Sequence, residues 1–371
     1  MQRVCLGLKV FFFWQILFIL AHAHKWSRSS SDSNAPQEWN FNSGSEQVWY
    51  GDDMIYENYL GKKNIEYDSN FTRSTKFRIC SNSKLMTTIA ILQLVEDGKI
   101  GSIYDSIGDY LDSNDLQSWG YPANTSTFCP TVYNTTTCQN VTFVSLMSMS
   151  SGVIAAITCD YAPDQWQYQY CIPPEKQTVY PGSIADTISY FIQNPLNWPP
   201  GPAYNTTYNT YWYANENFII LSYFVEKYSN LSLANYFNRN IFQPLGMNDT
   251  LYDPWNQAFY LHSEQSSEYY FYTDYAGNQN NLSTTPFAYG SCASNEVNPG
   301  FQAGSGGVVS TLPDMAKWYA SLFIVKNTSF LSDESLTQVL FPWALESTEP
   351  YQYYGLGIET MYADPIYSLP P

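Results

Sequence analysis

Ser81 and Lys84 are the residues of this chain whose types and spacing best suit chemistry. Side chains three positions apart lie on one face of a helix, so an S-x-x-K pair brings a hydroxyl next to an amine. The positive end of the helix dipole favours a neutral amine there, and a neutral lysine can take the proton of a serine nucleophile. The alternative is a serine and a lysine at a solvated helix start.

The residues after Lys84 predict a buried helix. Apolar side chains cover nearly every face of residues 85–97, whereas a solvated helix is apolar on one face only. Gly98 is suited to end this helix. A lysine that leads a buried helix lies near the protein interior, where burial lowers its pKa.

The start of the chain is typical of a secretory signal. Arg3 and Lys9 provide basic charge, residues 10–20 are apolar, and a small-x-small cleavage site follows at residues 21–23. We expect residues 1–23 to be a cleaved signal peptide, with an uncleaved anchor as the alternative. Cleavage leaves no stable membrane insertion, because no later apolar segment approaches the length of a bilayer span.

Cysteines and sequons agree with export. Short separations favour the bridges Cys129–Cys138 and Cys159–Cys171, and Cys80 and Cys292 remain as a third pair or as free thiols. Nine N-x-S/T sequons suit a glycoprotein that is secreted, or lumenal in an endomembrane or lysosome-like compartment. Their asparagines are Asn70, Asn124, Asn134, Asn140, Asn205, Asn230, Asn248, Asn281 and Asn327.

Charge and histidine content argue against several classes of function. The chain has a formal net charge of −17 and only three histidines. An acidic surface repels phosphates, so we expect no nucleic acid partner. His22 and His24 lie at the signal boundary, and His262 alone cannot make a zinc site. We expect neither a metal nor an organic cofactor.

The rest of the chain predicts a short linker followed by mixed α and β structure. Residues 24–44 are polar and Ser-rich, and we expect a flexible lead-in. Residues 47–59 mix aromatic and polar side chains around a Gly-Asp-Asp turn, which predicts a strand hairpin. Further helices are predicted at residues 142–149, 184–193, 215–228, 232–242 and 311–325.

Five ordered segments resemble one family. They are residues 77–100 around Ser81, 141–152 (VTFVSLMSMSSG), 198–201 (WPPG), 241–250 (IFQPLGMNDT) and 304–317 (GSGGVVSTLPDMAK). Together they resemble the serine β-lactamase and penicillin-binding-protein superfamily, in its class C-like branch. In the second segment, Met149 stands where that family usually has a histidine.

The resemblance implies a fold and its division along the chain. It implies an α+β, β-lactamase/transpeptidase-like fold, in which helices flank an antiparallel sheet and a mainly helical region is added. One β-lactamase-related domain is expected over residues 45–371. Its sheet part is expected at about 45–100 and 301–371, and its helical part at about 101–300.

The resemblance also implies a Y-x-N motif beside the nucleophile. Of four copies, only Tyr213-Ala214-Asn215 follows a Pro-Gly turn and leads directly into an apolar helix. We expect Tyr213 to handle protons together with Lys84, and Asn215 to orient Lys84. The alternative for Tyr213 is a buried aromatic that packs and forms a hydrogen bond. The other copies begin at Tyr56, Tyr228 and Tyr236.

Residues 354–357 (YGLG) resemble the strand that precedes the third motif of the family. That motif, a Lys or His two residues before a Gly, has no match after them. We therefore expect the C-terminal strands of the family's sheet to be truncated. The leading hypothesis is a secreted serine hydrolase that forms an acyl-enzyme with a small-molecule or peptide amide or ester, as a peptidase, esterase or β-lactamase-like enzyme. The alternative is a catalytically inactive secreted glycoprotein on the same fold. A structural glycoprotein with chance motif matches is a third hypothesis, and the oligomeric state is left open.

Overall fold

The computed structural model of the 371-residue chain divides into two compact units. Unit 1 comprises Met1–Cys80, Asn238–Pro299 and Gly307–Asn327, and unit 2 comprises Ser81–Phe237, Gly300–Gly306 and Thr328–Pro371. The structure describes residues 7–13, 16–26, 39–50, 53–64, 68–157, 164–173, 176, 182–201, 211–253, 271–273, 279–282, 299–325, 327, 330–348 and 351–361.

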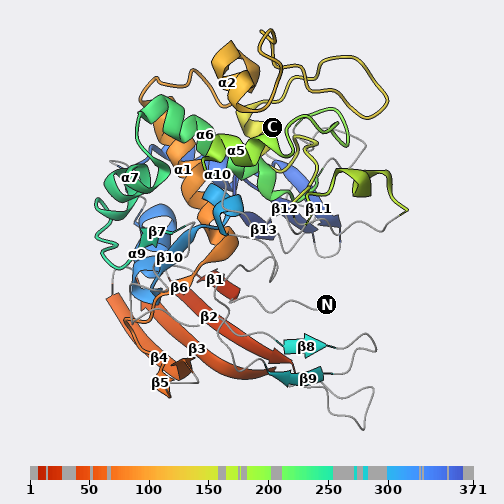
Figure 1. Ribbon diagram of the computed structural model, residues 1–371. Helices are drawn as coiled ribbons and strands as arrows, with labels where there is room; N and C mark the ends of the chain where they lie inside the picture. Colours follow the sequence, from red (N-terminus) through yellow and green to blue (C-terminus); the bar gives the residue numbers. More distant parts are fainter. Residues whose placement is uncertain are drawn as a thin grey trace. The chain divides into compact units, whose positions relative to one another are not determined.

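Unit 1 contains two larger antiparallel sheets and a two-stranded ribbon (Figure 1). The first sheet has the order β1 (Gly7–Phe13), β2 (Ile16–Trp26), β3 (Trp39–Tyr50), β4 (Asp53–Asn64) and β5 (Ser69–Asn70). The second has the order β6 (Phe77–Arg78), β10 (Val308–Ser310) and β7 (Leu251–Tyr252). The ribbon pairs β8 (Phe271–Thr273) with β9 (Gln279–Leu282).

The first sheet begins earlier in the chain than the sequence predicted. Strand β1 and most of β2 fall within the predicted signal peptide, and β3 starts inside the predicted lead-in. Residues 39–44 are therefore not a linker, because β3 pairs with both β2 and β4. The β3–β4 connection, with Tyr50 opposite Asp53, confirms the predicted hairpin. Cleavage of the signal stays a prediction.

Helix α9 (Leu312–Phe323) in unit 1 begins as its sequence predicted. Thr311 caps the helix by accepting the Asp314 N–H at 3.4 Å, and a proline occupies the first turn, where no N–H partner is needed. The Asp314 carboxylate also accepts the Thr250 hydroxyl at 3.0 Å. This network joins the start of α9 to the residue that precedes β7.

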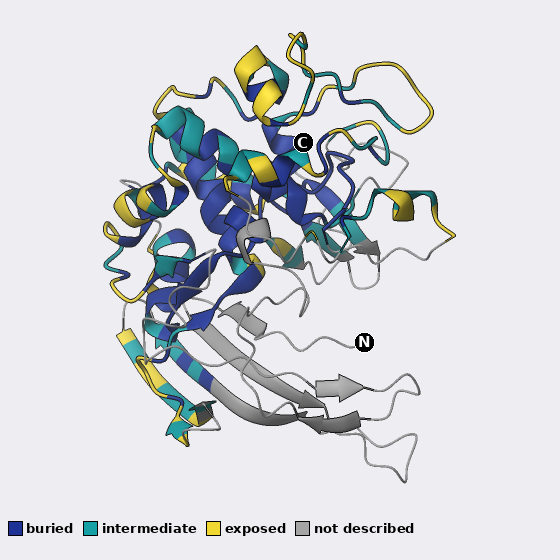
Figure 2. Cartoon of the chain, viewed as in Figure 1, coloured by how far each residue is buried: buried dark blue, intermediate teal, exposed yellow. Residues whose placement is uncertain are grey.

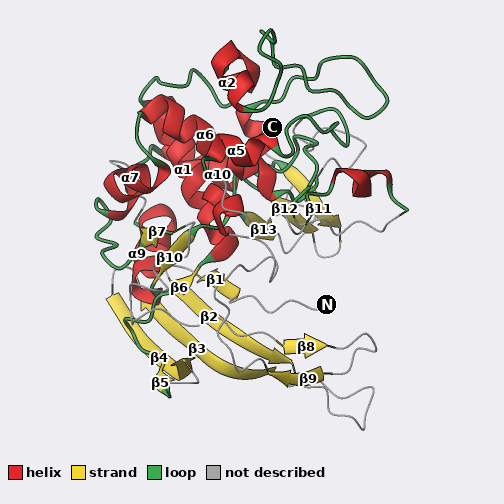
Figure 3. Cartoon of the chain, viewed as in Figure 1, coloured by secondary structure: helices red, strands yellow, loops and turns green. Residues whose placement is uncertain are grey.

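Unit 2 combines helices with a three-stranded antiparallel sheet (Figure 3). The sheet has the order β11 (Ala344–Thr348), β12 (Tyr351–Tyr354) and β13 (Glu359–Met361). The helices are α1 (Ser83–Glu96), α2 (Ser113–Ser118), α3 (Phe143–Met147), α5 (Ile184–Ser189), α6 (Asn215–Ser229), α7 (Leu233–Phe237) and α10 (Asp333–Leu340). Short 3₁₀ turns include η1 (Cys80–Asn82), which precedes α1, and η6 (Pro299–Ser305).

Helices α1 and α6 pack against each other and are largely buried (Figure 2). Side chains on nearly every face of α1 are buried, as the sequence predicted, and Gly98 follows the helix with a φ of 67°. The predicted helix at 232–242 is divided: α7 ends at Phe237 and a π-helical turn continues over Asn238–Phe242.

Cysteine pairing agrees in part with the predicted bridges. The Cys129–Cys138 disulfide is present, which confirms that prediction. Cys80 and Cys171 are also disulfide-bonded, so Cys80 is not a free thiol. Cys159 and Cys292 lie outside the described residues. Within the part of the chain that the structure describes, no helix has both the length and the apolar character to cross a membrane.

Candidate active site

Ser81 lies in the 3₁₀ turn η1, immediately before α1, and its side chain is exposed. The preceding residue, Cys80, has a φ of 50°, in the left-handed region that side-chain-bearing residues seldom adopt. Backbone outliers of this kind are concentrated at functional sites. The turn thus presents a hydroxyl at the start of an otherwise buried helix.

Lys84 is fully buried and makes three short polar contacts. Its Nζ lies 3.1 Å from Ser81 Oγ, 2.7 Å from Asn215 Oδ1 and 2.9 Å from the carbonyl oxygen of Ser305. The Asn215 oxygen comes from the first residue of α6 and the Ser305 oxygen from the last residue of η6. Three distant segments of unit 2 therefore hold the amine in place.

Tyr213 completes the cluster from the segment that leads into α6. Its hydroxyl donates to Ser81 Oγ at 2.5 Å, and its ring centroid lies 4.8 Å from Lys84 Nζ. The structure thus brings together all four residues predicted from the motifs, although 132 positions separate Tyr213 from Ser81. Their catalytic roles stay predictions.

The other Y-x-N copies do not contribute to this cluster. The Tyr228 hydroxyl donates to the Tyr110 carbonyl at 2.9 Å, and the Tyr236 hydroxyl lies 3.4 Å from the Ala90 carbonyl. The Tyr56 hydroxyl donates to Glu46 in unit 1 at 2.9 Å. The hydroxyl of each of these tyrosines thus has a partner outside the cluster.

Burial controls the charge of Lys84. The loss of solvation lowers the pKa of Lys84 to about 7, against the opposing influence of the Glu216 and Glu359 carboxylates. A large fraction of Lys84 is therefore a neutral amine near neutral pH. Within the described residues, no three His, Cys, Asp or Glu side chains gather to hold a metal ion.

The contacts of Lys84 match a neutral amine that acts as a base. A neutral amine has two N–H groups and one lone pair. The oxygens of Asn215 and Ser305 are acceptors only, so they take the two N–H groups. The lone pair of the neutral amine then faces the Ser81 hydroxyl, to which Lys84 Nζ donates in the structure at 3.1 Å, while the Tyr213 hydroxyl also donates to Oγ. The arrangement can remove a proton from Ser81.

Met149 supports the turn that carries Tyr213 and Asn215. Its sulfur accepts the Ala214 N–H at 3.4 Å and the Asn217 side-chain amide at 3.2 Å, and it is fully buried. This thioether fixes the start of α6 from the segment after α3. In the sequence, Met149 was noted only as a departure from the family pattern, and its role in supporting this turn was not predicted.

Two glutamates and two tyrosines form one wall beside the cluster, which we call the tyrosine–glutamate wall (Tyr211, Tyr354, Glu346 and Glu359). The Tyr354 ring lies edge-on to the Tyr213 ring at 6.4 Å and 5.6 Å from the Tyr211 ring. The Tyr211 hydroxyl donates to Glu346 at 3.2 Å. Sequence reasoning did not identify these residues as part of the site.

The strands of unit 2 explain where the two glutamates lie. Glu346 is the extra residue of a bulge in β11, between the pairs Leu345–Tyr353 and Ser347–Gln352. Such bulges redirect a side chain. Glu359 is exposed on β13 and pairs directly with Tyr354. Burial raises the pKa of the Glu346 carboxyl, and the negative charge of Glu359 raises it further.

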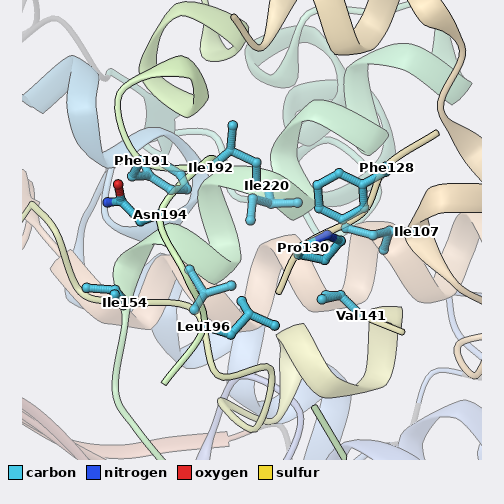
Figure 4. Close-up of a pocket in the computed structure, with 11 residues that line it drawn as sticks. Ile107, Phe128, Pro130, Val141, Ile154, Phe191, Ile192, Asn194, Leu196 and Ile220 are labelled. Carbon is cyan, nitrogen blue, oxygen red and sulfur yellow. The ribbon is translucent and has the colours of Figure 1, made fainter. Parts of the chain in front are cut away.

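A small cavity elsewhere in unit 2 is separate from this cluster (Figure 4). Its volume of about 10 Å³ is at the lower limit for one water molecule. None of the four predicted site residues lines it, so it belongs to the packing of the core. The lining residues are Ile107, Phe128, Pro130, Val141, Val153, Ile154, Phe191, Ile192, Asn194, Leu196 and Ile220.

Comparison with known families identifies the class of protein to which this fold and site belong. The family described as Beta-lactamase matches residues 33–363. The chain therefore belongs to the Beta-lactamase family, which confirms the predicted superfamily and the β-lactamase/transpeptidase-like α+β fold.

Solved structures with this fold include penicillin-binding and amide-cleaving proteins. A penicillin binding protein from Bacillus halodurans is 24% identical with a TM-score of 0.59, over 85% of this chain and 78% of that one. A D-stereospecific amidohydrolase from a Streptomyces species is 16% identical with a TM-score of 0.55, over 83% of this chain and 75% of that one. At these identities the likeness shows the fold alone.

A curated relative is also a hydrolase by name. The probable hydrolase clz13 of Cochliobolus lunatus is 26% identical over 195 residues, which are 49% of this chain and 31% of that protein. This chain spans between 29% and 38% of the lengths of three curated relatives that it matches. Family membership supports a serine hydrolase.

Proposed function

We propose that this protein is a serine hydrolase that cleaves a small amide or ester, including a peptide, through an acyl-enzyme on Ser81. One observation carries the proposal: the Ser81 Oγ lies 3.1 Å from Lys84 Nζ and 2.5 Å from the Tyr213 hydroxyl. Nucleophile and base are thus within the hydrogen-bonding distance that activation of a hydroxyl needs.

The reaction begins with Lys84 as the base. Lys84 takes the Ser81 hydroxyl proton while Oγ forms a bond to the substrate carbonyl carbon, and the electron pair of the C=O bond moves to its oxygen. The Ser81 N–H, in the turn η1 that leads into α1, donates to that oxyanion. No metal or organic cofactor is needed for this step.

Tyr213 serves the second half of acylation. The electron pair of the oxyanion re-forms the C=O bond while the bond from the carbonyl carbon to the leaving amine or alcohol breaks, and the leaving group receives a proton by way of the Tyr213 hydroxyl. Lys84 supplies the proton that replaces it. Water then attacks the acyl-Ser81 ester along the same route, which releases the acid and restores the Ser81 hydroxyl.

Asn215 and Ser305 hold the base without taking part in the bond changes. Each accepts an N–H of Lys84, so the lone pair of the amine stays directed toward Ser81. Precise orientation of this kind accounts for a large part of the rate of many enzymes. We further propose that the enzyme acts after export, because its sequence begins like a signal peptide.

Covalent labelling of Ser81 tests the proposal. A fluorophosphonate and a fluorescent penicillin should label the folded protein, and Ser81→Ala should abolish the label. Ser113→Ala is the matched control, since Ser113 is an exposed serine at the first position of α2. A folded protein that no probe labels would favour the inactive glycoprotein instead.

A further inference from the structure

Glu216 is a buried carboxylate that the proposed reaction does not use. It follows Asn215 in the first turn of α6 and is 0% exposed. Its Oε1 accepts the Ile157 N–H at 2.6 Å. Among the residues that the structure describes, nothing forms a hydrogen bond with its Oε2, which is also buried.

A half-satisfied carboxylate in the interior needs an explanation. Glutamate is almost never fully buried unless it is paired, and a buried oxygen without a partner destabilises the fold. A glutamine or an apolar residue would avoid much of that cost. An unsatisfied buried group in a native protein therefore points to a role other than stability.

The buried amine of the active site contacts the residue next to Glu216 in the first turn of α6. Lys84 Nζ contacts Asn215, the residue directly before Glu216, at 2.7 Å. The negative charges of two carboxylates raise the pKa of Lys84: Glu216 on α6 and Glu359 on β13. In turn, hydrogen bonds from the Ile157 and Ala156 N–H groups and the positive charge of Lys84 lower the pKa of Glu216. The two buried groups therefore share one electrostatic environment.

We propose that Glu216 is a positioning residue that sets whether the Lys84 amine carries a proton. When the Glu216 carboxylate is charged, it stabilises the ammonium form of Lys84. When Glu216 takes up a proton, that attraction is lost and Lys84 returns to the neutral form that can accept the Ser81 proton. The inference rests on the proposed role of Lys84 as the base.

The energetics of burial agree with this coupling. Burial lowers the pKa of Lys84 and raises the pKa of Glu216, because each charged form loses its solvation. The opposite charges attract, which shifts each pKa back toward its ordinary value. Two ionisable groups that are coupled in this way titrate as a pair. Glu359 favours the ammonium form as well, but it is exposed and therefore screened by solvent.

Lysine titration by NMR tests the proposal without relying on activity. The protein is labelled with ¹³Cε-lysine, and the Lys84 signal is assigned by its loss in Lys84→Met. In Glu216→Gln, the midpoint of the Lys84 titration should fall by about one pH unit, because an attractive charge has been removed. Glu226→Gln is the matched control on α6, since Glu226 is half-buried and accepts the Leu233 N–H at 2.7 Å. Its Lys84 midpoint should equal that of the wild type.

Labelling kinetics provide a second measurement. In Glu216→Gln, the acid side of the pH profile for fluorophosphonate labelling should move to lower pH by the same amount, with the high-pH rate within about twofold of the wild type. A Lys84 midpoint that is unchanged in Glu216→Gln overturns the proposal. If that variant does not fold, the wild-type Lys84 signal must show a second inflection from Glu216, and a single inflection overturns the proposal.

The two proposals fail in different ways. If the Lys84 midpoint shifts but no probe labels Ser81 at any pH, the hydrolase proposal is wrong and the coupling of Glu216 to Lys84 stands. If labelling occurs and neither midpoint nor pH profile responds to Glu216→Gln, the hydrolase proposal stands and the role of Glu216 is wrong.

Discussion

Lys84 has three hydrogen-bond partners, and their chemistry decides which proton moves first. Asn215 Oδ1 and the Ser305 carbonyl can only accept, whereas the Ser81 hydroxyl can also donate. A charged Lys84 donates to all three and cannot accept the Ser81 proton, whereas a neutral Lys84 keeps a lone pair that can accept it. The reactivity of Ser81 should therefore follow the fraction of Lys84 that is neutral.

We expect the rate of fluorophosphonate labelling to rise with pH and to reach half its maximum near pH 7. Lys84 is charged below its pKa of about 7 and neutral above it, so the rate should fall about tenfold for each pH unit well below that value. The measurement is the pseudo-first-order labelling rate between pH 5 and 9. A flat profile in a folded protein would contradict Lys84 as the base.

Tyr213→Phe should lower the labelling rate by about 10²- to 10⁴-fold, the usual contribution of a positioned acid or base. The change removes the hydroxyl that lies 2.5 Å from Ser81 Oγ and keeps the ring that packs on Tyr354. Tyr228→Phe is the control, because Tyr228 belongs to another Y-x-N copy and bonds the Tyr110 carbonyl. Equal rates in both variants would argue against the motif assignment.

The sequence alone predicted the four side chains of the candidate site. It did not predict the groups that surround them and hold them in place. Ser81, Lys84, Tyr213 and Asn215 were predicted because motif order and spacing identify them. The Ser305 carbonyl could not be predicted, since any residue has a carbonyl and only the fold brings this one to Lys84. The same holds for Glu346, whose placement depends on a bulge in β11.

At the level of elements, local signals located helix starts well. Thr311 and the proline after it predicted the start of α9, and the apolar run after Lys84 predicted α1. Strand ends were less predictable. The Tyr354–Gly357 sequence was compared to a strand, but β12 ends at Tyr354 and residues 355–358 form a turn into β13. Gly357 has a φ of 74° there, which a strand excludes.

Gly357→Ala should destabilise the protein and slow labelling of Ser81. A Cβ at this position would lie 2.5 Å from Thr88 Oγ1 and 3.0 Å from the Lys84 carbonyl, so the backbone of the proposed base must shift. Positive φ at a non-glycine residue adds a cost of about 1–3 kcal/mol. The measurements are thermal unfolding and the labelling rate.

Gly98→Ala separates the effect of backbone strain from the effect of close contacts made by the new Cβ. Gly98 also has a positive φ, of 67°, but a Cβ there meets nothing within 4 Å. This control should lose stability from backbone strain alone and keep the wild-type labelling rate. Equal labelling rates in Gly357→Ala and Gly98→Ala would show that the turn before β13 does not position Lys84.

At the level of the whole molecule, the division of the chain differs from the predicted one. We expected residues 301–371 to join the sheet part, whereas Gly300–Gly306 and Thr328–Pro371 group with the helices of unit 2. The reason is long-range pairing: the Leu356 N–H donates to the Val339 carbonyl in α10, and the Gly357 N–H donates to the carbonyl of Met147, the last residue of α3. Periodicity in a single sequence does not report such contacts.

We expect the exported protein to carry N-linked glycans. Treatment with a peptide N-glycosidase should increase its mobility on a gel, and N-terminal sequencing should show cleavage near Ala23. The structure leaves six sequon asparagines exposed, while Asn327 is half-buried and the side chains of Asn205 and Asn281 lie outside the described residues. The exposed six are Asn70, Asn124, Asn134, Asn140, Asn230 and Asn248. A product that starts at Met1 and does not shift would contradict export.

The thioether of Met149 has a consequence for how the site responds to its surroundings. Sulfur in methionine neither gains nor loses a proton in water, so its bonds to Ala214 and Asn217 keep the same strength in an acidic vesicle as at neutral pH. An imidazole at this position would titrate between pH 5 and 8 and would change from acceptor to donor as it did so. With methionine there, acidification alters the charges around Lys84 while the turn that carries Tyr213 keeps its anchor.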